Sequence, residues 1–182
     1  MIRIAASGPT PALTLRRWTE EDIPALIKAH ADPDMRRWLM RHIENEEQAL
    51  ATLLTQQADW NARTRFTFAV VGVVGGADEL LGGVSLRRVA KEPDAAEVGY
   101  WTVAEARGKS VAVRAVEGVL NWAEGAWGDE PLERFNLIHT LGNNASCRVA
   151  TKLGFELAEE LPPYPPKFME PGHLHVRHVH ER

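Results

Sequence analysis

Residues 105–114, with the sequence EARGKSVAVR, combine residue types that can bind a phosphate group. Gly108 and Ser110 are small, and Arg107 and Lys109 are basic, at a point where a strand-like run gives way to an apolar-periodic helix. The first amides of a helix lack intrahelical partners, so small residues here let a pyrophosphate approach them closely. An ordinary basic turn that opens a helix is the alternative.

The run Gly108-Lys109-Ser110 also imitates the end of a Walker nucleotide-binding loop. That loop needs another glycine five residues before Gly108, and this chain has Val103 there. The spacing therefore excludes a P-loop.

A second motif, NNASCRVATKLGF, occupies residues 143–155. Together the two segments resemble the GNAT superfamily of acetyl-CoA-dependent N-acyltransferases, particularly the branch that acetylates the N-termini of ribosomal proteins. In that superfamily an Arg/Gln-x-x-Gly-x-Gly/Ala loop binds the CoA pyrophosphate. It maps onto residues 107–112, with Ser110 where a glycine is usual. Three further runs follow the order of that branch, so the resemblance covers roughly residues 12–161: LRRWTEED from Leu15, LGGVSL from Leu81 and EVGYW from Glu97.

The resemblance implies a CoA site made largely of backbone groups. The expected cofactor-binding residues are Trp101, Thr102, Val103, Arg107, Gly108, Lys109, Ser110, Val111, Ala112 and Asn143. The loop would hold the pyrophosphate, the amides of residues 101–103 would hold the pantetheine arm and polarise the acetyl carbonyl, and Asn143 would lie near that arm. Acetyl-CoA is then the acetyl donor, and no metal is expected.

Acetyl transfer to an amine needs a base for the ammonium proton and a proton donor for the departing thiolate. Glu97 is the candidate base, because alternation places it on the strand face of Trp101 and Val103. A solvated strand carboxylate is the alternative. Many superfamily members use a tyrosine as donor, but Ala150 occupies the matching place. The resemblance to the N-terminal acetyltransferase branch instead implies Ser146, whose counterpart there is proposed as the donor. A helix-start serine that bonds backbone amides is the alternative for Ser146.

Composition limits the classes of function. With 182 residues, 45% of them hydrophobic, the chain is expected to form one domain over residues 1–182. Its net charge of −4 argues against a nucleic-acid partner and mildly favours a cationic one, such as an amine. Cys147 is the single cysteine, which excludes an intrachain disulfide. No secretory signal is evident, and the longest apolar run, 68–77, is too short to span a bilayer, so a cytoplasmic protein without a membrane partner is expected.

Hydrophobic periodicity and turn residues predict an order of elements typical of the GNAT fold. Strands are expected at residues 13–17, 66–74, 80–88, 97–103, 137–141, from 155 and at 173–180, and helices at 19–31, 34–40, 44–60, 110–127 and 145–153. The fold class is α/β (α+β), with a mixed, mostly antiparallel twisted sheet of about six to seven strands flanked by about four helices. The resemblance implies that the fourth and fifth strands splay apart and that the thioester enters the gap.

Histidines gather near the C-terminus at His173, His175, His178 and His180. Alternation along one strand puts the first two on one face and the last two on the other, so four ligands cannot converge from that strand. Exposed strand histidines are therefore expected. Cys147 is interpreted as a half-buried helix residue, because no motif pairs it with a base.

These features predict an N-acetyltransferase that moves acetyl from acetyl-CoA to a primary amine, on a protein N-terminus or a small molecule, by direct attack in a ternary complex. The alternative is a CoA-binding sensor or interaction module without transferase activity. The acceptor pocket is expected between the early helices and the loop at 161–166. The tryptophans are expected mostly in the core or at its rim, although Trp38 and Trp60 could line this pocket. The final strand could pair in a homodimer.

Overall fold

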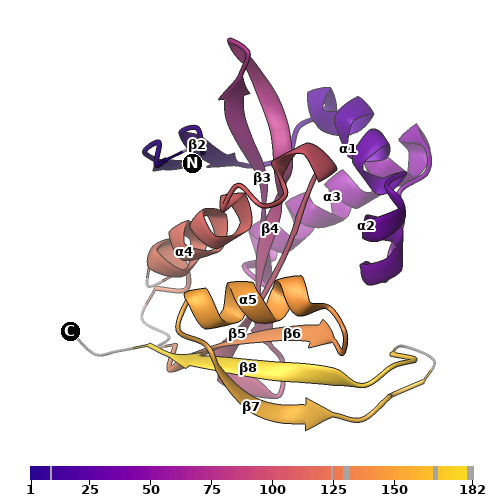
Figure 1. The fold of residues 1–182 in the computed structure, drawn as a ribbon. Coiled ribbons are helices and arrows are strands. Elements are labelled where there is room, and N and C mark those ends of the chain that lie inside the picture. The colour runs from indigo at the N-terminus through magenta and orange to yellow at the C-terminus, as the bar shows by residue number, and fades with distance from the viewer. Residues whose placement is uncertain (9, 124, 129–131, 166–167, 180–182) are drawn as a thin grey trace.

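The computed structural model describes residues 1–8, 10–123, 125–128, 132–165 and 168–179, which form an eight-stranded sheet with helices on both faces (Figure 1). The strand order is β1-β2-β3-β4-β5-β6-β8-β7. The strands are β1 (Ile2–Ile4), β2 (Leu13–Arg16), β3 (Arg65–Val74), β4 (Ala77–Val89), β5 (Glu92–Thr102), β6 (Arg134–Thr140), β7 (Glu156–Leu161) and β8 (Gly172–His178). The helices are η1 (Glu20–Asp22), α1 (Ile23–His30), α2 (Pro33–Trp38), α3 (Glu46–Ala62), η2 (Ala104–Ala106), α4 (Val111–Ala123) and α5 (Asn144–Lys152).

The sheet is mixed and mostly antiparallel, which confirms the fold class expected from the sequence. It has more strands than expected, because the short β1 adds to the edge of β2. Helix α4 stops at Ala123, before its expected end, and Trp127 lies in the turn that follows, where its indole N–H donates to the carbonyl of Arg63 at 2.6 Å. His180 lies outside the described residues. Among those residues, no helix combines the length and apolarity that crossing a membrane requires.

Strands β5 and β6 are paired over a short stretch only. Their parallel register runs from Ala95 opposite Arg134 to Val98 opposite Leu137. Beyond it, β5 continues to Thr102 in pairing with β4, while β6 continues to Thr140 in pairing with β8. The two strands thus part after Val98, and each leaves a backbone edge facing a gap.

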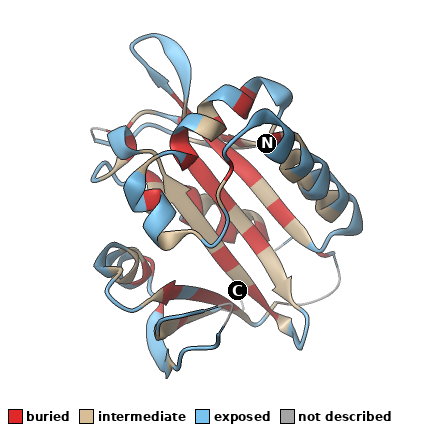
Figure 2. Cartoon of the chain, turned by 90° about the vertical axis from the view of Figure 1, so that its right-hand side faces the viewer, coloured by how far each residue is buried: buried red, intermediate tan, exposed pale blue. Residues whose placement is uncertain are grey.

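Two apolar clusters fix the helices to the sheet. In Figure 1, α4 lies on one side of β4 and α1 to α3 on the other, while α5 lies over β6 and β8. Buried and half-buried positions succeed one another along the central strands (Figure 2), as expected for strands covered on both faces. The larger cluster joins alternate residues of β3 to β6 with α4 and α5, and the smaller one contains Ile23, Leu26, Ile43 and Ala49.

Trp60 belongs to the larger cluster rather than to an acceptor pocket. Its ring lies 4.8 Å from that of Phe66 and 5.1 Å from that of Phe68, and its N–H donates to the carbonyl of Thr67 at 3.0 Å. The suggestion that Trp60 lines a pocket is therefore wrong, because the end of α3 turns this ring into the core. Trp38 is half-buried, with the guanidinium of Arg37 4.6 Å from its ring.

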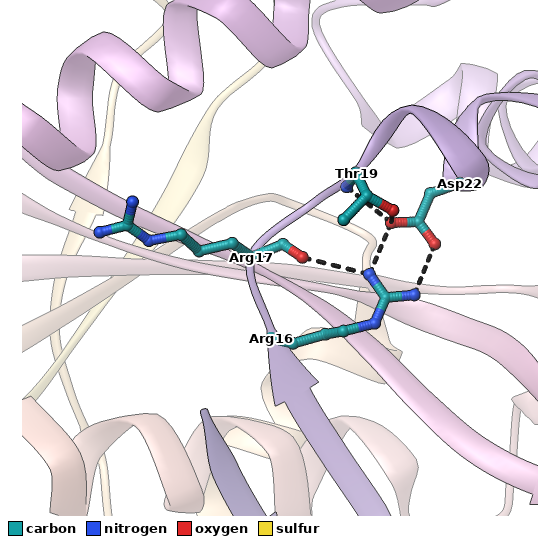
Figure 3. Close-up of polar contacts among 4 residues, drawn as sticks. All are labelled: Arg16, Arg17, Thr19 and Asp22. Atoms are coloured by element: carbon teal, nitrogen blue, oxygen red, sulfur yellow. Dashed lines mark hydrogen bonds and ion pairs between the residues drawn. The ribbon is translucent and has the colours of Figure 1, made fainter.

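A partly buried ion pair sets the path from β2 into α1 (Figure 3). Both terminal nitrogens of Arg16 donate to the carboxylate of Asp22 at 2.7 Å, and the amide of Thr19 donates to it at 2.9 Å. Burial alone would raise the pKa of Asp22, but the hydrogen bonds from Arg16 and Thr19 outweigh it and hold that pKa below its usual range. This junction holds α1 against the sheet beside the gap.

Candidate active site

The loop before α4 leaves the first amides of that helix without intrahelical partners. The amide of Arg114 donates to the carbonyl of Ser110 at 3.1 Å, which makes Ser110 the residue that opens the first turn. The amides of residues 110–113 therefore precede the first intrahelical donor. These amides and the positive end of the helix dipole can meet a pyrophosphate.

Two residues of this loop have left-handed backbone conformations. Gly108 has φ of 73° and Ser110 has φ of 60°. Ser110 occupies the place where the resemblance expects glycine, and its φ shows why a glycine is usual there: a residue with a Cβ adopts this region at a cost of about 1 kcal/mol. The loop keeps its shape with serine, at some strain.

The side chain of Arg107 is held by α2 rather than free beside the loop. Its guanidinium donates to Asp32 at 2.5 Å and to Asp34 at 2.9 Å. The hydrogen bonds to Asp32 from Arg107 and from the amide of Met35 lower the pKa of that carboxyl. The hydroxyl of Thr10 donates to the carbonyl of Lys109 and fixes the other side of the loop. Arg107 thus ties the loop to α2, which leaves Lys109 as an exposed cation of the loop.

The backbone amides of residues 101–103, which are expected to hold the pantetheine arm, point in two opposite directions. Val103 follows the end of β5, and its amide donates to the carbonyl of Leu81 at 3.0 Å, toward β4. Because successive amides of a strand point to opposite edges, the amide of Thr102 points toward the gap and that of Trp101 toward β4. The geometry therefore favours Thr102, and not Val103, as a donor to a ligand in the gap.

Ser146 lies at the start of α5, where it meets Tyr100 of β5. The hydroxyl of Tyr100 donates to the Oγ of Ser146 at 3.1 Å. Burial raises the pKa of Tyr100, although its bond to Ser146 acts the other way. Asn143 caps α5, because its Oδ1 accepts from the amide of Ser146 at 3.2 Å. The sequence identified Ser146 as the candidate proton donor, and the structure adds Tyr100, which is bonded to it.

Glu97 lies just before the strands part, on the sheet face opposite the one that carries Tyr100. Its Oε2 accepts from Nη2 of Arg87 at 2.8 Å, across the β4–β5 pair. Trp101 shares this face, packing with the smaller cluster, but Val103 packs against the larger cluster. The expected alignment of Glu97 with Trp101 thus holds, and the alignment with Val103 does not, because the strand ends at Thr102.

Sequence reasoning did not identify His30, which comes from the end of α1. Its ring lies 5.7 Å from the ring of Trp101, which also stacks at 6.0 Å on Trp18. Among the described residues, the Nδ1 of His30, the Nδ1 of His42 and the Nε1 of Trp18 are buried without a hydrogen-bond partner. Burial, and then the nearby positive groups His42 and Arg36, lower the pKa of His30. The imidazole of His30, with its lowered pKa, therefore lies beside Trp101, on the face of β5 that also carries Glu97.

A group of histidines surrounds Cys147 on the opposite face, under α5. The Sγ of Cys147 lies 3.3 Å from Nε2 of His139, 3.5 Å from Nδ1 of His173 and 3.8 Å from Nε2 of His175. Burial lowers the pKa of both His139 and His175. The sequence correctly predicts that His173 and His175 share a face. The sequence analysis did not predict that these two histidines meet His139 of β6 and Cys147 of α5. The only sequence signal for this cluster is the His-x-His run in the last strand.

A hollow of the described surface lies elsewhere, with a volume of about 530 Å³. Arg63, Arg65, Arg87, Arg88 and Trp127 are among its lining residues. The hollow opens near the end of β4. The loop before α4 lies instead near the beginning of that strand, because Val103, which precedes the loop, bonds to the carbonyl of Leu81. The hollow therefore does not belong to the site at the gap.

Comparison with known proteins places these features in a family. A family model described as an acetyltransferase (GNAT) domain matches residues 12–156. None of the curated proteins compared with the chain matches it.

Solved structures of acetyltransferases share the fold at low identity. RimJ of Mycobacterium smegmatis in complex with CoA-disulfide is 17% identical, with a TM-score of 0.78 over 94% of this chain and 84% of that one. An acetyltransferase from Salmonella typhimurium that modifies the N-terminal serine of a 50S ribosomal subunit protein is 18% identical, with a TM-score of 0.75 over 92% and 95%. The microcin self-immunity acetyltransferase MccE, in complex with acetyl-CoA and AMP, is 15% identical, with a TM-score of 0.75 over 92% of each chain. The match of the family model over most of its length shows that the chain belongs to the GNAT acetyltransferase family.

Proposed function

We propose that the protein is an N-acetyltransferase that moves acetyl from acetyl-CoA to a primary amine by direct attack in a ternary complex. The observation that carries the proposal is that β5, after parting from β6, leads through η2 directly into the amide-rich start of α4. The amides of residues 110–113 would bind the pyrophosphate, and the Thr102 amide would meet the pantetheine arm or the acetyl carbonyl. Asn143, as the cap of α5, borders that path.

The two faces of β5 supply different proton chemistry. On the α5 face, Tyr100 and Ser146 form a hydrogen-bonded pair that can donate a proton to the departing CoA thiolate. On the α1 face, Glu97 is the base suggested by the sequence, and His30 is a second candidate suggested by the structure. Glu97 already binds Arg87, whereas His30 Nδ1 has no partner among the described residues. We therefore favour His30, acting through a water molecule, as the group that takes the amine proton.

The acceptor is proposed to be a peptide N-terminus or a small-molecule amine. Support comes from the fold shared with the ribosomal-protein acetyltransferase of Salmonella typhimurium and from the chain's net charge of −4, which favours a cation. The alternative is a CoA-binding sensor, which would be compatible with Ala150 in the place of the family's tyrosine and Ser110 in the place of its glycine.

Thiol release from acetyl-CoA tests the proposal. The purified protein is incubated with acetyl-CoA and short peptides that begin with Ala, Ser or Thr, or with polyamines or aminoglycosides, while acetyl-CoA binding is measured in the same samples. Amine-dependent release with one class is expected and identifies the acceptor. Binding without release from any amine would favour the sensor, and absence of binding would contradict both readings.

A further inference from the structure

The cluster beneath α5 brings together residues from three separate elements. His139 comes from β6, Cys147 from α5, and His173 and His175 from β8. One ligand atom from each lies within 4.8 Å of every other. His139 pairs with His173 across the two strands, and alternation puts His175 on the same face, so the sheet presents three imidazoles to the thiol. The sequence argument against a metal considered β8 alone and could not include the other two elements.

The separations within the cluster match a tetrahedral ion. Zinc binds imidazole nitrogen at about 2.0–2.1 Å and thiolate sulfur at about 2.3 Å, so tetrahedral geometry requires N···N near 3.3 Å and N···S near 3.6 Å. Nε2 of His139 lies 3.2 Å from Nε2 of His175. The three sulfur-to-nitrogen separations are 3.3, 3.5 and 3.8 Å. Four of the six distances between ligand atoms are thus within a few tenths of an ångström of the values that a tetrahedral site requires.

The surroundings orient the rings for coordination. Nδ1 of His139 lies 2.9 Å from the carbonyl of Thr140, which can only accept, so the ring proton sits on Nδ1 and the lone pair of Nε2 faces the cluster. A ligand histidine is commonly held in this way by its second nitrogen. His139 and His175 are 8% and 4% exposed, a degree of burial that is costly for polar rings without full partners.

We propose that His139, Cys147, His173 and His175 bind one zinc ion. Imidazole and thiolate suit Zn²⁺, and four protein ligands close the site, which is typical of a structural rather than a hydrolytic zinc. Binding converts the Cys147 thiol to thiolate and releases one proton to solvent. The ion joins α5 to β6 and β8, and so supports the helix start that holds Ser146. The proposal does not depend on acetyl transfer.

Metal titration of untagged protein tests the site. After dialysis against metal-free buffer, the protein is titrated with Zn²⁺ or Co²⁺ and the metal content is measured by mass spectrometry. One ion per chain is expected, and Co²⁺ should give a thiolate-to-cobalt charge-transfer band together with the intense visible bands of tetrahedral cobalt. Zn²⁺ should also raise the unfolding temperature. Failure of the wild type to retain an ion, or an octahedral cobalt spectrum, would overturn the proposal and leave a hydrogen-bonded thiol–imidazole group.

Variants assign the ligands. Cys147→Ser should abolish the charge-transfer band and weaken Zn²⁺ binding by roughly 100-fold or more, because serine is a poor ligand for zinc. His178→Ala is the matched control, since His178 is exposed on the opposite face of the same strand, and it should bind as the wild type does. Equal affinity of Cys147→Ser and wild type would remove Cys147 from the site. If Cys147→Ser does not fold, the wild-type cobalt spectrum alone decides.

Discussion

The loop before α4 and the corner beneath α5 build polar sites in opposite ways. The loop offers backbone amides from consecutive residues, and its shape depends on the left-handed φ of Gly108 and Ser110. The corner offers side chains from distant segments, such as Tyr100 and Ser146, which meet only because α5 packs on the sheet. A backbone amide remains in place when its side chain is substituted, whereas a side-chain hydroxyl is lost. Substitutions should therefore act mildly at the loop and severely at the corner.

The largest effect is expected from Tyr100→Phe, which removes only the hydroxyl bonded to Ser146. Turnover should fall about 100-fold, within the range for loss of a positioned proton donor, while the Kd for acetyl-CoA stays within about twofold. Steady-state kinetics with the identified amine and a separate binding titration measure the two effects. The control is Tyr164→Phe, because that ring is 70% exposed. Full turnover of Tyr100→Phe would show that the corner does not supply the proton.

A comparison of His30→Gln with Glu97→Gln extends the contrast to the other face of β5. We expect about a 30-fold loss of kcat for His30→Gln and less than about threefold for Glu97→Gln. The lowered pKa of His30 keeps its ring neutral at pH 7, so the acidic limb of the wild-type kcat profile should lie below pH 6.5, with activity falling as the ring gains a proton. This limb should be absent in His30→Gln. The reverse ranking of the two variants would assign the base to Glu97.

A smaller effect is expected at the loop from Gly108→Val. The site of the added Cβ is open, so the penalty arises from forcing a branched residue to φ of 73°. Affinity for acetyl-CoA should fall about tenfold, with little change in kcat at saturation. Gly125→Val is the control, since it adds the same side chain at an open glycine without a left-handed φ. Isothermal titration of both variants measures the difference, and equal affinities would argue against phosphate binding at the loop.

The smallest effect, and the only gain, is expected from Ser110→Gly. Glycine relieves the left-handed strain at φ of 60° but adds freedom to the unfolded chain, so the free energy of unfolding should rise by about 0.5–1 kcal/mol. Chemical denaturation with and without acetyl-CoA measures the change. A loss of stability would mean that the serine hydroxyl makes a contact worth more than the strain.

The turn and helix of the loop could be predicted from the sequence, whereas the contacts at the corner could not, for a physical reason. Consecutive residues such as Gly108, Lys109 and Ser110 leave a local pattern, and the turn and helix follow from their own propensities. The meeting of His139 with Cys147 depends on the packing of α5, on which local propensity has no bearing. The same applies to His30, whose neighbour Trp101 is distant in the chain.

Other misses came from the ends of elements. The sequence placed Val103 in the strand, but its amide turns to Leu81 as the chain enters η2. It suggested Trp60 for the acceptor pocket, since amphipathic aromatic residues are common there. That ring instead packs against Phe66 and Phe68 of β3, in an apolar environment. Both errors arose where tertiary contacts decide the direction of a single group.

The short β5–β6 pairing has a consequence for how the chain folds. Strands β2 to β5 lie beside one another in the sheet in their chain order, so the β3–β4 and β4–β5 hairpins close over short loops. Strand β6 follows β5 in the chain only after the whole of α4. A long loop must therefore close before the few parallel residue pairs between β5 and β6 can form. Because local contacts form sooner, pulse-labelled hydrogen exchange during refolding should show protection in β3 to β5 before β6 and β8. Simultaneous protection would indicate a single nucleus, whereas the expected order would make the seam proposed to bind acetyl-CoA the last part of the sheet to close.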